Sequence, residues 1–280
     1  MTTPVETRPR VAQVSAAAAY VAASSNLRAG LLGFISRAFR LRGSWNRPDM
    51  EWFAQFVAPQ VVASQRYLAS LTDQYLASDL SVQTGRDVAP VGVELPEDLR
   101  GVPVEDVYRR PYVQLWTDLS RGVPFDDAVS RAERRAVVLA HTDYQMARVH
   151  ASQAALAGQP NVQFWRRVPT GDRNCLLCLV ASTQRYRKEN LAAIHPQCDC
   201  IVQGIPGDRD PGQVIDPALL EQVHAAVEAA GFRSDRGGRA PDYRHLIVTN
   251  RHGELGPVLG LRGQNFTGPD DLNRGDTPQD

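Results

Sequence analysis

All four cysteines of this 280-residue chain lie within the 26 residues from 175 to 200. They form two pairs, a Cys-x-x-Cys at Cys175 and Cys178 and a Cys-x-Cys at Cys198 and Cys200. A Cys-x-x-Cys at the end of a strand or in a tight turn presents two sulfur atoms to one ion. In an extended segment, residues two apart have side chains on the same face, so the second pair is aimed in the same way. The two pairs could therefore close one tetrahedral metal site.

His195, in the run His-Pro-Gln-Cys, adds a fifth possible ligand close to Cys198. Four thiolates, or three thiolates and one imidazole, satisfy zinc equally well. The sequence thus predicts a structural zinc site whose ligands come from Cys175, Cys178, His195, Cys198 and Cys200. Two alternatives stay open: a reduced cluster that packs as small apolar groups, or two disulfides formed outside the cell. A thiol redox enzyme is disfavoured, because its Cys-x-x-Cys opens a helix in a βαβ unit and no such pattern occurs here.

The composition is typical of a soluble globular protein, with 43% hydrophobic and 22% charged residues. The charges of the 31 basic and 31 acidic groups cancel, so the net charge does not favour sequence-independent binding to DNA phosphates. No run approaches the roughly 20 apolar residues of a membrane span, so we expect no membrane partner. The chain start resembles a signal peptide only superficially, because its helical pattern continues to residue 42. We expect the chain to work in a cytoplasm, where reduced cysteines favour metal over disulfides.

The first part of the chain, residues 1–157, is predicted to be a helical domain. Apolar residues recur at helical spacing, and internal breakers are few. The predicted helices are residues 11–42, 49–79, 104–121 and 125–157. The last of them begins after Pro124 with acidic residues in its first turn, and Gly158 follows its end. A Gly- and Pro-rich stretch between the second and third helices predicts a long loop.

After residue 158 the pattern changes to that of a smaller module, residues 158–268, followed by a flexible tail, 269–280. β-branched and aromatic residues predict strands, and Asp-Pro and Gly delimit one helix. The predicted elements are strands at 162–170, 199–206 and 245–250 and a helix at 216–232. The predicted fold class is therefore α+β: a mostly helical N-terminal half, then a small α+β module that the Cys/His zinc site pins.

Three stretches resemble the phage Mu F-like family of minor head proteins. They are "AVVLAHTDYQMAR" (136–148), "FWRRVPTGDRNCLLC" (164–178) and "HPQCDCIV" (195–202). In that family a helix with an Ala-Arg-Thr-Glu-like element precedes a Trp-containing strand, a Cys-x-x-Cys and a His-Pro-x-Cys-x-Cys run. Here His141 and Asp143 replace the arginine and the glutamate of that element. Trp165, Pro196 and all five candidate ligands match the family pattern.

The resemblance covers residues 120–205 and implies a minor head protein of a tailed bacteriophage, at or near the portal vertex, that acts in capsid assembly or DNA delivery. It implies the phage portal and the major capsid or scaffold proteins as partners, with phage DNA as a further contact to be tested. The implied location is the virion, after assembly in the host cytoplasm. Residues 251–272 also resemble actinobacteriophage proteins of this group that are often labelled capsid maturation proteases.

A capsid maturation protease is therefore the first alternative, although the residues themselves favour a non-enzymatic role. The chain has no His-Glu-x-x-His motif. Ser182 with His195 is a conceivable pair for a serine mechanism, but no Gly-x-Ser-x-Gly elbow frames the serine. Thiols that bind a metal cannot also attack a peptide bond.

The second alternative is a zinc-pinned DNA-binding module. Basic residues surround the cysteines and would contact phosphates, while Trp165 and Tyr186 would stack on bases. These basic residues are Arg166, Arg167, Arg173, Arg185, Arg187 and Lys188. The competing interpretation is that their charges solvate the surface, since acidic residues offset them along the chain.

Overall fold

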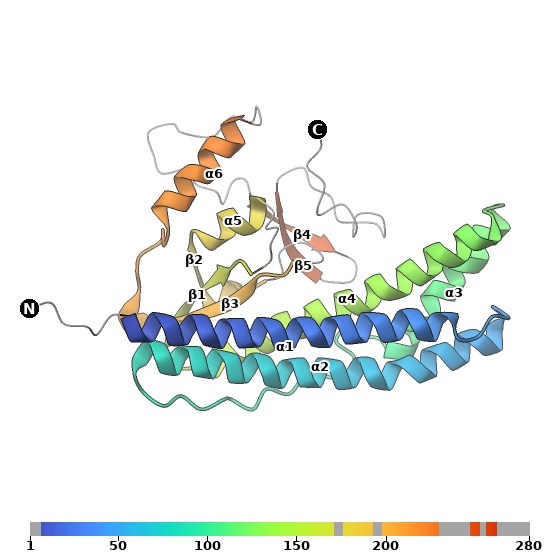
Figure 1. Cartoon of the computed structure of the whole chain (residues 1–280), viewed down its shortest axis with the longest axis horizontal. Coiled ribbons are helices and arrows are strands. Elements are labelled where there is room, and N and C mark those ends of the chain that lie inside the picture. The colour runs from blue at the N-terminus through green and yellow to red at the C-terminus, as the bar shows by residue number, and fades with distance from the viewer. Residues whose placement is uncertain (1–6, 171–175, 193–197, 230–246, 253–255, 262–280) are drawn as a thin grey trace, which may run out of the picture.

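The structure, a computed structural model, describes residues 7–170, 176–192, 198–229, 247–252 and 256–261. Four long helices form its elongated base (Figure 1). They are α1 (Thr7–Arg40), α2 (Arg47–Thr84), α3 (Val104–Ser120) and α4 (Phe125–Ala157). All four predicted helices are confirmed, and their ends differ from the predicted ones by at most five residues.

A small antiparallel sheet lies against one end of this base (Figure 1). Its strands are β1 (Val162–Val168), β2 (Arg185–Arg187) and β3 (Ile201–Pro206), in the order β2-β1-β3. The other elements are α5 (Leu176–Ser182), two 3-10 turns, η1 (Lys188–Asn190) and η2 (Gly207–Arg209), α6 (Pro217–Ala229), and a hairpin of β4 (Ile247–His252) and β5 (Gly256–Leu261). The α+β class is confirmed. The predicted tail, 269–280, lies outside the described residues.

Local chemistry fixes the ends of α2. Asn46 caps its first turn, because the side-chain oxygen of Asn46 accepts a hydrogen bond from the amide of Asp49 at 3.0 Å. The Asp49 carboxylate in turn accepts from the amides of Ser44 and Trp45, at 3.0 and 2.9 Å. At the other end, Gly85 adopts φ 68°, a left-handed conformation that suits glycine and ends helices. Asn46 and Asp49 therefore hold the turn between α1 and α2, and Gly85 ends α2.

Aromatic rings fill the core of the helical base. The ring centroid of Phe39 lies 5.4 Å from that of Phe53 and 5.2 Å from that of Tyr112, which joins α1, α2 and α3. The fourth helix packs against these rings mainly through small side chains. They include Ala128, Ala132 and Ala136. Small residues on α4 allow its backbone to approach the rings closely, so the four helices bury one continuous core.

A second core joins the sheet to the helices. Its members come from α1, α2 and α4 on one side, and from β1, β3 and the residue after η1, Leu191, on the other. They are Tyr20, Tyr75, Leu76, Leu80, Ala155, Leu156, Val162, Trp165, Leu191, Ile201 and Val202. A Cβ atom at Gly204 of β3 would lie 3.0 Å from a methyl carbon of Leu156, so glycine permits this close approach. The Asp79 carboxylate of α2 accepts from Gln203 of β3 at 2.8 Å, which adds a buried polar link between helix and sheet.

Candidate metal centre

Three of the predicted ligands meet in the folded chain. Cys178, Cys198 and Cys200 are buried, and their sulfur atoms all lie within 4.8 Å of one another. The Sγ atoms of Cys178 and Cys198 are 3.4 Å apart, which is too far for a disulfide bond. Tetrahedral sites with metal–sulfur bonds of about 2.3 Å place sulfur atoms about 3.8 Å apart, so this cluster fits a thiophilic cation. The other two predicted ligands, Cys175 and His195, lie outside the described residues.

The local structure around the cysteines differs from the prediction in one respect. Cys178 lies in the short helix α5 and not at a strand end or in a tight turn. The reason is the run "LLCLVAS", which contains no Gly or Pro and has three leucines and one alanine, both good helix formers. Cys198 and Cys200 are both buried while the Asp199 side chain between them is 44% exposed. This confirms that the two cysteines share one face of an extended segment.

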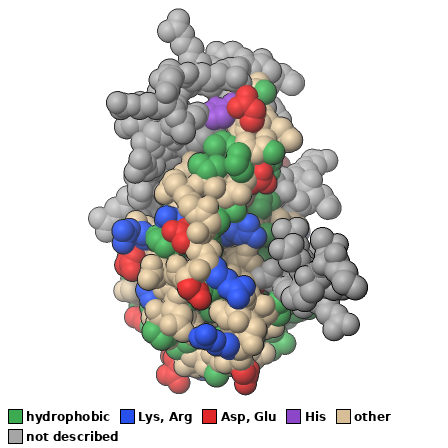
Figure 2. Space-filling model, turned by 90° about the vertical axis from the view of Figure 1, so that its left-hand side faces the viewer, with side chains coloured by type: hydrophobic (Ala, Val, Ile, Leu, Met, Phe, Trp, Pro, Cys, Tyr) green, Lys and Arg blue, Asp and Glu red, His purple; other side chains and the backbone are tan. Residues whose placement is uncertain are grey.

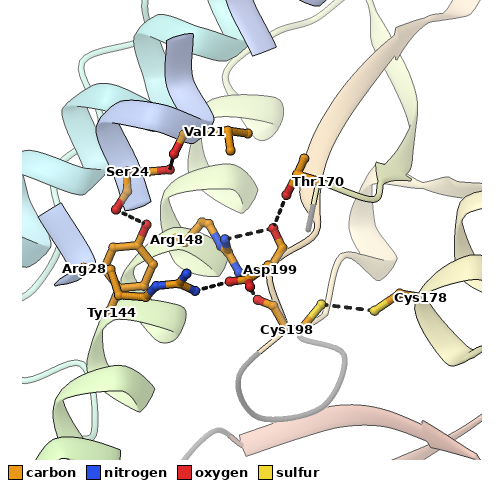
Figure 3. Close-up of polar contacts among 9 residues, drawn as sticks. All are labelled: Val21, Ser24, Arg28, Tyr144, Arg148, Thr170, Cys178, Cys198 and Asp199. Carbon is orange, nitrogen blue, oxygen red and sulfur yellow. Dashed lines mark hydrogen bonds and ion pairs between the residues drawn. The ribbon is translucent and has the colours of Figure 1, made fainter. Parts of the chain in front are cut away.

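A buried arginine of α4 holds the backbone of this segment (Figure 3). The guanidinium of Arg148 donates to the carbonyl oxygen of Cys198 and, at 3.4 Å, to that of Asp199. The hydroxyl of Thr170 also donates to the Asp199 carbonyl, at 2.8 Å. Arg28 of α1 pairs with the Asp199 carboxylate. The segment that carries two of the thiols is therefore anchored on α1, on α4 and on the residues that follow β1.

Electrostatics favours a cation among the three thiols. A contact with Cys178 favours the thiolate of Cys200, but the Cys198 thiol and burial outweigh it and raise the pKa of Cys200. Without a cation, neighbouring buried thiolates would repel one another, which favours the protonated thiol at Cys200. The guanidinium of Arg148, which stays charged in proteins and is only 8% exposed here, places one positive charge beside them. A bound metal ion would supply the rest of the compensating charge.

His141 of α4 lies in the same charged surroundings. Burial lowers its pKa to about 4, and the nearby guanidinium groups of Arg28 and Arg148 act in the same direction. The imidazole is therefore neutral near pH 7.

Asp143, the other residue that departs from the family element, accepts a hydrogen bond from Nε of Arg100 at 2.7 Å and one from the hydroxyl of Tyr108 at 2.8 Å. Asp143 and Arg100 therefore form a buried ion pair, which joins α4 to the segment before α3.

Ser182, the candidate nucleophile of a serine mechanism, lies at the end of α5. The residue is buried, and its hydroxyl donates to the carbonyl oxygen of Leu179 at 2.8 Å. This hydrogen bond is the usual one for a serine in a last helical turn. The hydroxyl is therefore engaged with its own helix and is not presented to a substrate.

Two of the six basic residues predicted near the cysteines make contacts that serve the fold. Arg167 is buried, donates to the carbonyl oxygen of Ala192 and lies with its guanidinium 5.0 Å from the ring centroid of Trp165. Arg185 pairs with Asp210. Arg173 lies outside the described residues. Figure 2 shows one end of the molecule, where Lys and Arg side chains lie apart from one another among acidic and uncharged ones.

No protein-family model, no curated protein and no solved structure matches this chain. Across the described part of the chain, every helix is too short or too polar to cross a membrane.

Proposed function

We propose that Cys178, Cys198 and Cys200 bind a structural zinc ion, with Cys175 or His195 as the fourth ligand. The observation that carries this proposal is the burial of three thiols within 4.8 Å of one another. Thiolate ligands select soft or borderline metals, and zinc sites with three or four cysteines and no open position are structural. The three described ligands come from α5 and from the segment before β3, so the ion would tie these two elements together.

A tie of this kind suits the small module around the cysteines. The cluster itself contains few apolar residues besides the thiols: Ala181 is buried with them, and Tyr186 packs against them. So little apolar burial contributes only a small part of the stability that a domain needs. Metal binding contributes folding free energy directly, because the site exists only in the folded state.

We further propose that the chain is a minor head component of a tailed bacteriophage, placed at or near the portal vertex of the virion after assembly in the host cytoplasm. The sequence resemblance over residues 120–205 supports this role. Its partners would be the phage portal and the major capsid or scaffold proteins, and long helices such as α1 and α2 offer extended faces for docking. The role is structural and requires no catalytic group.

Metal analysis tests the site directly. We expect roughly one zinc per chain in protein purified under reducing conditions, as for other closed structural sites. Cys175→Ser and His195→Ala should separate the two candidates for the fourth ligand, because only the true ligand lowers the zinc content. His150→Ala is the matched control, since this histidine lies on α4 and outside the cluster. Protein without zinc or another thiophilic metal would refute the proposal.

Peptide mass spectrometry of mature particles tests the biological role. We expect the chain to be present at low copy number, whether or not the major capsid protein is trimmed. Three results together would make the chain a maturation protease and the minor head proposal wrong. These are absence of the chain from the particles, loss of the N-terminal segment of the capsid protein, and loss of that trimming in Ser182→Ala. The DNA-binding alternative predicts that Arg185→Gln with Arg187→Gln reduces the salt dependence of DNA binding.

A further inference from the structure

One face of α2 presents apolar side chains to solvent. Trp52, Phe56, Pro59, Ala63 and Tyr67, here called the α2 stripe, are spaced four, three, four and four residues apart. At 100° per residue they lie within about 80° of arc. Phe56 and Tyr67 are 42% and 56% exposed, whereas Trp52 is half-buried and its ring stacks on Phe56 with centroids 4.7 Å apart. Single exposed apolar residues are normal, but a contiguous stripe over four helical turns marks an interaction site.

A groove of about 560 Å³ adjoins the stripe. Ala58, Pro59, Val62 and Ala63 of α2 form one wall, and the first residue of α3, Val104, contributes to the other. Pro59 and Ala63 belong to both the stripe and the groove, so the two features form one continuous surface. Because these side chains are small, the groove has room for larger aliphatic side chains from a partner.

The rim of the groove is acidic. Glu97, Asp98 and Glu105 line it, together with Arg66, whose guanidinium pairs with Glu97 at 2.5 Å. Three carboxylates and one guanidinium give the groove a formal charge of 1 − 3 = −2. The Glu97 side chain is 72% exposed and is therefore accessible to a cation from a partner. A ligand that matches this surface carries aliphatic side chains flanked by lysine or arginine.

We infer that the α2 stripe and its groove bind an amphipathic, basic helix of a partner protein. A helix in a groove buries a row of apolar side chains at spacings of three and four residues, which is the spacing that the stripe presents. A second copy of this chain docked groove to groove would place like carboxylates against one another, which disfavours self-association through this face. The inference depends neither on the zinc site nor on the phage assignment, since it uses only α2, the start of α3 and the connection between them.

A pair of designed peptides tests this inference with the full chain. Each is a helix about three heptads long with leucine at the a and d positions, and the flanking positions carry lysine in one peptide and glutamate in the other. We expect the lysine peptide to bind with a dissociation constant in the micromolar range and the glutamate peptide at least tenfold more weakly, by fluorescence anisotropy. Hydrogen exchange should slow in residues 52–67 and 97–105 when the lysine peptide is bound.

Charge reversal makes the test specific. Glu97→Lys combined with Glu105→Lys should reverse the preference between the two peptides. Glu94→Lys is the control and should leave the preference unchanged, because Glu94 is exposed between α2 and α3 but does not line the groove. Circular dichroism of each variant confirms that it is folded. Equal binding of both peptides, or protection elsewhere in the chain, would overturn the inference. A dimer in sedimentation that Ala63→Asp dissociates would also overturn it, because the occupant would then be a second copy.

Discussion

Replacing Arg148 with methionine tests whether the helical base holds the cysteine segment in place. Methionine keeps most of the length of the side chain but carries no charge and donates no hydrogen bond. The change leaves the buried carbonyl oxygen of Cys198 without its Arg148 donor, while the Asp199 carbonyl keeps the donor of Thr170. A lost hydrogen bond from a charged donor costs about 1.5–3 kcal/mol, and an unsatisfied buried acceptor costs about 1–3 kcal/mol. We therefore expect the free energy of unfolding to fall by about 2–4 kcal/mol.

The same substitution should weaken metal binding. A guanidinium within about 8 Å of a thiolate contributes roughly 2 kcal/mol at an effective dielectric constant of 20. Removing the charge of Arg148 should therefore raise the dissociation constant for zinc by about tenfold to thirtyfold. Competition with a chromophoric chelator measures this constant, and thermal unfolding in saturating zinc measures the stability. For a chain of this size the melting temperature should fall by roughly 5–15 °C.

Two further variants separate the contributions of Arg148. Arg148→Lys keeps the charge but has fewer donors, so it should restore most of the zinc affinity and only part of the stability. Arg131→Met is the matched control, because Arg131 is exposed on the same helix and its loss should change stability by less than about 0.5 kcal/mol. If Arg148→Met and Arg131→Met had the same stability and the same zinc affinity, the anchoring role of Arg148 would be refuted.

Three other perturbations follow from the described contacts. Cys178→Ser should lower the bound zinc measured by elemental analysis, and an unchanged zinc content would show that the ion lies elsewhere. Asp143→Ala removes the carboxylate that pairs with buried Arg100 and should cost about 3–5 kcal/mol in denaturant unfolding; a loss under about 1 kcal/mol would contradict this. Because the pKa of His141 is lowered to about 4 in the folded chain and is near 6.5 when unfolded, its contribution to stability is complete above pH 6.5 and is lost toward pH 4, at up to about 1.4 kcal/mol for each pH unit between these values. His141→Gln should flatten this slope in denaturant titrations, and an equally steep slope would exclude this histidine as its cause.

The helices can be predicted because their signals are local. Periodic apolar residues define α3 and α4 over their whole lengths. The predicted end of α2 is five residues too early, because polar residues around Ser81 look like the start of a loop. The helix in fact continues to Thr84, and Gly85 then ends it. Short elements such as β2 and α5 escape prediction, since three and seven residues are too few to show a period.

The candidate site can be predicted only in part. Cysteine spacing identifies the thiols, because metal ligands obey local geometric rules. The supporting residues carry no such signal: an arginine on a helix is usually exposed, and nothing in the sequence around Arg148 marks it as buried. Arg28 is even less accessible to sequence reasoning, since its partner Asp199 lies 171 positions away. Contacts of this range are set by how whole elements pack, which a single sequence does not reveal.

That separation of 171 residues has a consequence for synthesis on the ribosome. Translation at 5–20 residues per second takes roughly 9–34 s to pass from Arg28 to Asp199. During this interval α1 can pair with α2, but Arg28 has no Asp199 to pair with. The surface of α1 around Arg28 therefore stays open to chaperones until the cysteine segment leaves the ribosome. The contacts of α1 are thus complete only after the cysteine segment, which is made much later, has folded against it.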